Sequence, residues 1–402
     1  AEQKIQLNGL IGSSLSFVVQ SLFKKTEKPF LFILDDKEEA AYYLNDLEQM
    51  IGEEDVLFYP GSYRRPYQIE DTDNANVLLR AEVLNRINSR KKPAIIVTYP
   101  EALFEKVVTR KELDKNTLKV TVGDQISIDF INEVLFEYEF KRVDFITEPG
   151  EFSVRGGIVD VFSFSNDNPY RIEFFGNEVD SIRSFDVETQ LSIEKQKKIT
   201  IIPNVENKFF QENRESFLEY INNQTVLFIQ DTDLLFSKLD KLFAKATEIF
   251  ENLNATVNHV APHQLFLNQA EFIKKSLDFS IVELSSKPIY KTKATFDFHI
   301  KPQPSFNKQF DLLLNNLNDN HFNGYTNYLF CANENQAKRF HDIFESLDEA
   351  NSENIRKQYH TVVLPLFQGF IDEENQITCY TDHQIFERYH KFSIKNGYSK
   401  KQ

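Results

Sequence analysis

Short apolar runs alternate with longer amphipathic stretches over the first 120 or so residues of the chain. Apolar runs at 30–34, 56–59 and 94–98 predict buried strands, and the stretches 36–50 and 73–88 predict helices. Strands that alternate with helices are typical of a parallel sheet. The pattern therefore predicts an α/β domain at the start of the chain.

The pattern changes near residue 123. One predicted helix at 129–138 is followed by strand-like segments, which are separated by turn signals at 148–150, 156–157, 166–169 and 176–177. Turn signals at this hairpin spacing predict an inserted antiparallel α+β domain. Beyond Pro203 the first pattern returns, with a strand at 225–230 and helices at 234–253 and 264–276.

The segment Lys301–Ser305 contains two prolines and no apolar run, which is typical of a linker. Beyond it, strands near 328–331, 361–364 and 377–380 predict a small α/β third domain. We therefore expect a first domain in two segments, 1–122 and 204–302, with an inserted domain at 123–203. A linker at 303–308, a third domain at 309–392 and a basic tail at 393–402 follow.

Composition narrows the class of protein. The chain of 402 residues is 41% hydrophobic and 27% charged, as in ordinary soluble globular proteins. Its first residues show neither the basic start nor the apolar region of a signal peptide, and no apolar run reaches the ~18–20 residues that a membrane helix needs. Its two cysteines suit a reducing compartment. We expect a monomeric, cytoplasmic protein without membrane contact and, because it lacks a starting Met and ends on basic residues, a piece of a longer one.

The charge balance argues against bulk binding of nucleic acid. The net charge is −15, and so acidic a chain repels polyanions unless its positive charges are gathered locally. Basic strips at Arg64-Arg65 and at 391–401 leave a DNA-binding module as a possible interpretation.

A glycine- and serine-rich loop, Gly9–Ser16, precedes the strand at 30–34 and opens a predicted helix. Against the phosphate-binding pattern G-x-x-x-x-G-K-[ST] it keeps Gly9 and Ser16, contains Gly12 between them, and has Ser14 at the second glycine and Leu15 at the lysine. Without the lysine, tight nucleotide binding is implausible. The eight residues alone favour a simple Gly/Ser-rich helix start over a degenerate nucleotide loop.

Other catalytic and metal-binding patterns are missing from the sequence. His259 and His263 have ligand spacing, but Pro262 between them argues against the helix that would place both on one face. No G-x-S-x-G turn occurs. We therefore predict no catalytic residue and no metal site in this chain.

The segments 148–162 and 170–185 carry the strongest functional signal. Alternation places Tyr170, Ile172 and Phe174 on the core face of one strand, and Arg171, Glu173 and Phe175 on the other face. On the preceding strand it places Phe152 and Val154 inward, and Ser153 and Arg155 outward.

The predicted outward face therefore carries Arg155, Arg171 and Phe175, and arginine beside an exposed aromatic ring is typical of protein interfaces. An ordinary polar sheet face, with Phe175 under a loop, is the alternative that the pattern alone favours.

The same residues resemble a known family. The runs PGEFSVRGGIVDVF, YRIEFFGNEVDSIRSFD and ETQLSI resemble the second domain of UvrB, a nucleotide-excision-repair protein, and more closely that of the transcription-repair coupling factors, the Mfd family. Further similarity lies in Phe58-Tyr-Pro-Gly-Ser, Pro66-Tyr67, the helix that contains Arg80, the strand 95–98 and the segment 377–386. It covers nearly the whole chain and is weak between 205 and 370.

The resemblance implies a fold. It predicts a degenerate P-loop, RecA-like domain of the UvrB type in two segments, with the α+β domain inserted and a small α/β domain after it. UvrB carries the loop GVTGSGKT, which the coupling factors have lost, so the resemblance favours a degenerate loop at Gly9–Ser16. The DNA-clamping hairpin of UvrB has no counterpart here.

The resemblance also implies a function. In this family the second domain recruits UvrA through two arginines and a phenylalanine, which fall on Arg155, Arg171 and Phe175. The intact factor is an ATP-driven translocase on double-stranded DNA that displaces stalled RNA polymerase, and its ATP and Mg²⁺ serve motor domains whose motifs this chain lacks. We expect a non-catalytic recruitment module. The alternative is a UvrB-type ATPase and damage-binding subunit of the excinuclease.

Overall fold

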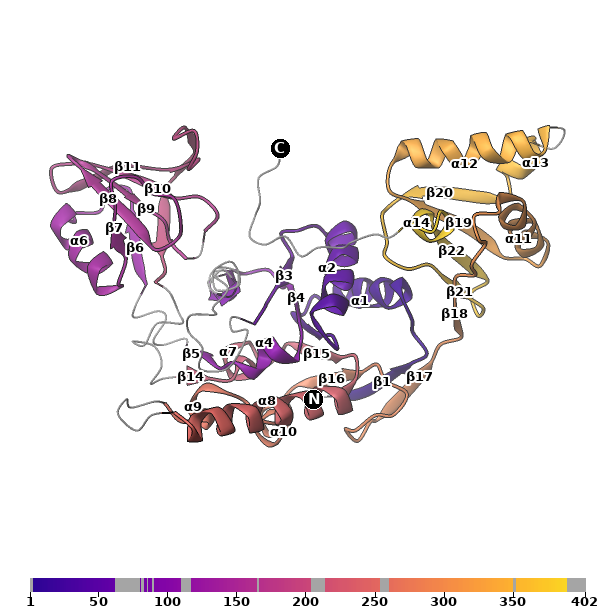
Figure 1. The fold of residues 1–402 in the computed structure, drawn as a ribbon, viewed down its shortest axis with the longest axis horizontal. Coiled ribbons are helices and arrows are strands. Elements are labelled where there is room, and N and C mark those ends of the chain that lie inside the picture. The colour runs from indigo at the N-terminus through magenta and orange to yellow at the C-terminus, as the bar shows by residue number, and fades with distance from the viewer. Residues whose placement is uncertain are drawn as a thin grey trace.

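A computed structural model describes most of the chain: residues 3–61, 80, 83, 84, 86–88, 90–109, 117–164, 166–203, 214–253, 260–349 and 352–388. Figure 1 shows a central domain, with the inserted domain on one side of it and the third domain on the other. The expected tail at 393–402, Arg64-Arg65, His259 and most of the expected helix 73–88 lie outside the described residues.

The first domain is built on a seven-stranded sheet in which every neighbouring pair is parallel. The order is β17-β1-β16-β15-β2-β4-β3. The strands are β1 (Lys4–Asn8), β2 (Phe30–Ile33), β3 (Val56–Phe58), β4 (Ile95–Thr98), β15 (Val226–Ile229), β16 (Ser280–Glu283) and β17 (Ala294–Asp297). Strands from before and after the insert are mixed in this order, so both parts of the chain build one α/β sheet.

Helices cover both faces of this sheet. Figure 1 shows α1 and α2 on one side, and α8 and α10 on the other. The helices are α1 (Ser13–Thr26), α2 (Lys37–Ile51), α4 (Pro100–Phe104), α7 (Phe217–Tyr220), α8 (Thr232–Glu251), α9 (Pro262–Leu265) and α10 (Gln269–Ser276). Asp36 caps α2 and Asp231 caps α8, each accepting an N–H from the first turn.

The single helix expected at 264–276 is wrong, because α9 and α10 are separate helices. Phe266 between them forms a β-bridge with Glu105, and Leu267 N–H donates to the Phe104 carbonyl at 2.8 Å. Asn268 then caps α10 by accepting the Glu271 N–H. A tertiary contact thus overrides the helical pattern.

The inserted domain is an antiparallel sheet packed on one helix. Its six strands lie in the order β12-β11-β10-β9-β8-β7, and only β7 and β8 run parallel. The elements are β6 (Leu118–Thr121), α6 (Ile128–Glu137), β7 (Lys141–Arg142), β8 (Glu151–Arg155), β9 (Ile158–Val161), β10 (Tyr170–Phe175), β11 (Glu178–Phe185), β12 (Ser192–Gln196) and β13 (Lys198–Ile201).

The chain enters and leaves the inserted domain through paired strands. β6 pairs antiparallel with β13, and Val120 and Ile199 share a core with Ile131 of α6. The core of the insert therefore begins at β6, slightly before the expected boundary at 123. A second short ribbon joins β5 (Val107–Val108) to β14 (Arg214–Glu215) in the first domain.

The third domain has a five-stranded mixed sheet in the order β18-β21-β22-β19-β20. Its elements are β18 (Ile300–Pro302), α11 (Phe310–Phe322), β19 (Thr326–Cys331), α12 (Glu334–Leu347), α13 (Ser352–Arg356), β20 (Tyr359–Val363), β21 (Phe370–Asp372), β22 (Ile377–Thr381) and α14 (Asp382–Ile385). None of the helices described in the chain is long and apolar enough to cross a membrane.

The segment expected to be a linker is part of the third domain. Lys301 and Pro302 lie in β18, which pairs antiparallel with β21. Gln303 accepts the Thr381 N–H at 2.8 Å, and Phe306 is 5% exposed within the core. The expected linker 303–308 is therefore held in the third domain at Gln303 and Phe306.

Candidate protein-docking site

The outer face of the inserted sheet brings the two predicted arginines together. Arg171 of β10 lies opposite Asp160 of β9, and Asp160 lies opposite Ser153 of β8. Arg155 lies at the end of β8, directly before the tight turn at Gly156-Gly157. Strand register therefore sets one carboxylate between two arginines.

Asp160 organises this cluster. It is 2% exposed, and both of its oxygens accept from Arg171, at 2.8 Å from Nε and 3.0 Å from Nη2. Arg155 Nη2 donates to the same carboxylate at 2.8 Å. Two guanidinium groups on one carboxylate leave a formal charge of about +1 and fix the orientation of both side chains.

Aromatic rings hold the two arginines from the side. The Arg171 guanidinium lies 4.4 Å from the centre of the Phe185 ring, and that of Arg155 lies 5.3 Å from the centre of Phe145. The hydrogen bond with Asp160 raises the pKa of Arg171 above its usual value. The Arg171 side chain is only 18% exposed and that of Arg155 is 46% exposed, so Arg155 is the more accessible of the two.

Phe175 projects from the other end of β10. It is 83% exposed, as strand alternation predicts, whereas Ile172 of the same strand is fully buried. Phe175 is four positions along the strand from Arg171, which is roughly 13 Å at 3.3 Å per residue. Glu173, between them on this face, is paired with Arg183. A ring this exposed does not lie under a loop.

Comparison with known proteins identifies the inserted domain. Residues 118–207 match the family model of the UvrB interaction domain. A transcription-repair-coupling factor of Bacillus subtilis (strain 168) is 33% identical over 254 residues, which are 63% of this chain and 20% of that protein. Those of Myxococcus xanthus and Escherichia coli (strain K12) are 28% and 25% identical over 209 and 202 residues, which are 50% of this chain and 17% of each relative.

The chain corresponds to an N-terminal region of the transcription-repair-coupling factors. This confirms the resemblance predicted from the sequence. The matched parts span about a fifth of the length of these relatives. The outer sheet face with Arg155, Arg171 and Phe175 thus belongs to the UvrB interaction domain.

Sequence reasoning missed the groups that hold the arginines. Asp160 is the one charged residue of the run Ile158–Val161, which marks it as unusual, but only the register shows that it faces Arg171. Phe145 is 65% exposed and precedes the first strand that alternation could analyse. Both residues extend the candidate docking site beyond the predicted set.

The loop Gly9–Ser16 follows β1 and includes the first turn of α1, which is the place of a phosphate-binding loop. Leu15 is 3% exposed in the main core, so the residue at the lysine position does not reach toward a ligand. The Ser16 hydroxyl donates to Asp46 at 2.7 Å, and Ser14 accepts the Ile11 N–H at 3.0 Å. Gly12 precedes the first helical residue and provides no side-chain cap.

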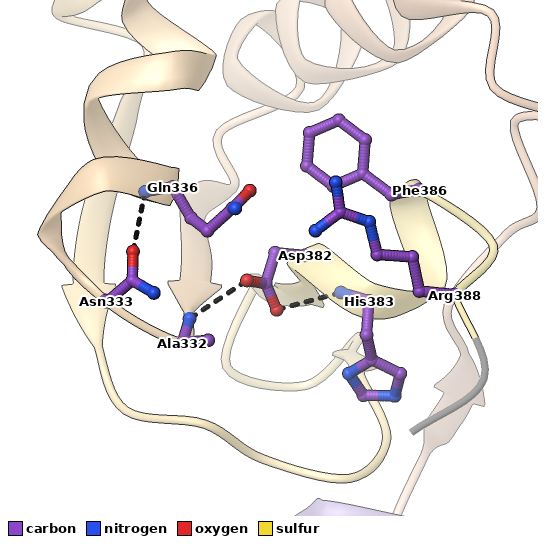
Figure 2. A pocket seen from close by; sticks show the side chains of 7 residues that line it. All are labelled: Ala332, Asn333, Gln336, Asp382, His383, Phe386 and Arg388. Carbon is purple, nitrogen blue, oxygen red and sulfur yellow. Dashed lines mark hydrogen bonds between the residues drawn. The ribbon is translucent and has the colours of Figure 1, made fainter. Parts of the chain in front are cut away.

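A small cavity lies in the third domain at the carboxyl ends of β19 and β22 (Figure 2). Its volume of about 110 Å³ is well below the roughly 300–1,000 Å³ of drug-sized ligand sites. Asp382 in its wall accepts the N–H groups of Ala332 and His383, at 2.9 and 2.8 Å. The cavity therefore has no room for a nucleotide.

Proposed function

We propose that this chain is a non-catalytic recruitment module of a transcription-repair-coupling factor, and that its UvrB interaction domain binds UvrA at stalled RNA polymerase. One observation carries the proposal. Arg155 and Arg171 are oriented in advance by Asp160, on the same sheet face as the exposed Phe175, within the domain that matches the UvrB interaction family.

The chemistry of the face supports a protein partner. The remaining positive charge suits carboxylates on the partner, and Phe175 would bury its ring there. Because Asp160 and the aromatic rings already hold the arginines, binding would cost little side-chain entropy. Loss of one such anchor typically weakens binding by about 2–4 kcal/mol.

The first domain, in this proposal, is a degenerate P-loop, RecA-like domain of the UvrB type without ATPase activity. The buried Leu15 in place of the lysine supports this. ATP and Mg²⁺ would serve only the motor of the full-length protein, which would also contact RNA polymerase and double-stranded DNA.

The proposal is tested by a UvrA pull-down with the chain and its Arg171→Ala and Phe175→Ala variants. Each variant is expected to weaken binding at least about tenfold, which corresponds to about 1.4 kcal/mol or more. Phe322→Ala is a matched control, because Phe322 is 94% exposed on the third domain. Unchanged binding in both test variants would exclude this face.

The alternative function, a UvrB-type ATPase, is distinguished from our proposal by titration with a fluorescent ATP analogue. Our proposal predicts no saturable signal from the intact chain, and a saturable signal would favour the ATPase.

A further inference from the structure

The amino end of α1 is occupied by a segment from the third domain. The Ser13 N–H donates to the Gln368 carbonyl at 3.2 Å, and the Gln368 N–H donates to the Ser13 hydroxyl at 3.2 Å. In a phosphate-binding loop, the backbone N–H groups at this place bind phosphate. Here Ser13 binds the protein's own main chain.

Asp46 of α2 joins the two domains at the same point. It is fully buried, and its Oδ2 accepts the hydroxyls of Ser13 and Ser16 at 2.7 Å each. Its other oxygen accepts the Phe367 N–H at 3.0 Å. One carboxylate thus connects the first turn of α1 to the chain that precedes β21.

Side chains of α2 also pack against this segment. The Phe367 ring stacks on Tyr42 at 5.1 Å between ring centres and meets Tyr43 edge-on at 5.0 Å. Asn45 donates to the Pro365 carbonyl at 3.3 Å. Pro365, Phe367 and Gln368 therefore each contact α1 or α2. Leu366 lies in an apolar core that both domains share.

Apolar packing continues this contact. Leu366, 2% exposed, belongs to a core of third-domain residues against which Phe17 of α1 and Met50 of α2 pack. Phe17 meets the rings of Phe330 and Phe370 edge-on, at 6.0 and 5.9 Å. The contact therefore combines main-chain hydrogen bonds with a shared apolar core.

Two glycines of the Gly9–Ser16 loop lie against later parts of the chain, and Gly12 alone lies against the segment 365–368. A Cβ on Gly12 would lie 3.0 Å from the Gln368 side chain, and one on Gly9 would lie 2.2 Å from the Phe298 carbonyl oxygen. Close approach of the later chain thus explains both glycines without a nucleotide.

We propose that the Gly9–Ser16 loop and Asp46 form a binding site for the segment 365–368, which fixes the third domain on the first domain as one rigid body. The ligand of this site is a short segment of the same chain, which is bound through its main-chain N–H and C=O groups and one aromatic side chain. The site is independent of UvrA binding, because its residues lie on other domains than Arg155, Arg171 and Phe175.

Hydrogen exchange on the intact chain tests the site directly. The Phe367 and Gln368 N–H groups donate to Asp46 and Ser13 rather than to a strand or helix partner, so only docking protects them. We expect both to be protected in the unmodified protein. Ser13→Ala is expected to speed their exchange about tenfold, because the Gln368 N–H loses its acceptor and Asp46 loses the hydroxyl donor of Ser13.

Three comparisons make the result decisive. The amides of β2 report the global fold and should keep their exchange rates. Ser305→Ala is the control variant, because Ser305 lies on the exposed surface of the third domain. If Ser13→Ala also speeds amide exchange in β2, the test rests on Phe367→Ala, which removes only the stacked ring. Unprotected Phe367 and Gln368 amides in the unmodified chain, or unchanged protection in Phe367→Ala, would overturn the proposal.

Discussion

Single buried polar residues organise both of the proposed binding sites of this protein. Asp160 orients Arg155 and Arg171, and Asp46 connects two helices to the third domain. A buried carboxylate is stable only when its oxygens are satisfied, and each of these two accepts three hydrogen bonds. The arginines of the proposed docking face therefore depend on Asp160, a buried residue that a bound protein would not contact.

Asp160→Ala is expected to lower the free energy of unfolding by about 3 kcal/mol. This is at the lower end of the usual cost of breaking a buried ion pair, because the Arg155 side chain is 46% exposed. It should also weaken UvrA binding, since both arginines lose their orientation. Urea unfolding and the UvrA pull-down measure the two effects.

The control is Asp180→Ala, which removes an exposed aspartate from β11 of the same domain. Equal stability and equal UvrA binding in the two variants would show that Asp160 does not organise the face.

At the scale of elements, contacts between segments decide where helices begin and end. Phe266 pairs with Glu105 and so divides a helical pattern into α9 and α10. At the start of α1, Gly12 adopts φ 54° and ψ −143°, a conformation that L side chains rarely adopt. Its geometry brings the first turn of α1 against Gln368.

Gly12→Ala is expected to lower the free energy of unfolding by about 1–3 kcal/mol, the typical cost of a strained backbone conformation, and to speed exchange of the Phe367 amide. Gly123→Ala is the matched control. Gly123 also has a positive φ, of 93°, but among the described atoms none lies within 4 Å of its added Cβ. Similar exchange at Phe367 in both variants would show that Gly12 does not support docking.

At the scale of the whole molecule, the chain folds back on itself twice. The first domain completes its sheet with strands on both sides of the insert, and the third domain returns to the amino end of α1. Asp46 lies at this second junction, where burial raises its pKa to about 7 although the hydrogen bonds from Ser13, Ser16 and Phe367 act to lower it. The raised pKa makes the junction sensitive to pH.

The folded state binds the Asp46 proton more tightly than the unfolded state, whose pKa is near 3.8. The contribution of Asp46 to stability is therefore fully present below about pH 4 and is lost as pH rises through about 7. We expect the free energy of unfolding of the unmodified chain to fall, relative to Asp46→Asn, between pH 4.5 and roughly pH 8.

Urea unfolding of both proteins across this range measures the difference. Asp35, whose pKa is also raised, to about 6, titrates in both proteins and cancels in the comparison. A constant difference between the two proteins would contradict the shift. Tyr43, whose pKa burial raises further above its usual value, also faces Asp46 and stays neutral throughout.

Local periodicity predicted much of the fold. The runs at 30–34, 56–59 and 94–98 became β2, β3 and β4, and alternation placed Ile172 inside and Phe175 outside. The sequence did not reveal β1, β16 and β17, because polar residues fill half or more of their positions and no continuous apolar run marks them. It placed the arginines on one face but not on a shared carboxylate.

The sequence by itself determined strands such as β2, β3 and β4, the faces of β10 and the resemblance to a repair family, because these depend on residue order and spacing over a few positions. Only the tertiary structure decided that Asp160 joins Arg155 and Arg171, and that residues 365–368 occupy the amino end of α1. Both depend on strand register and on contacts between residues that are far apart in the chain. Periodicity describes one element at a time, and such contacts arise only when elements pack together.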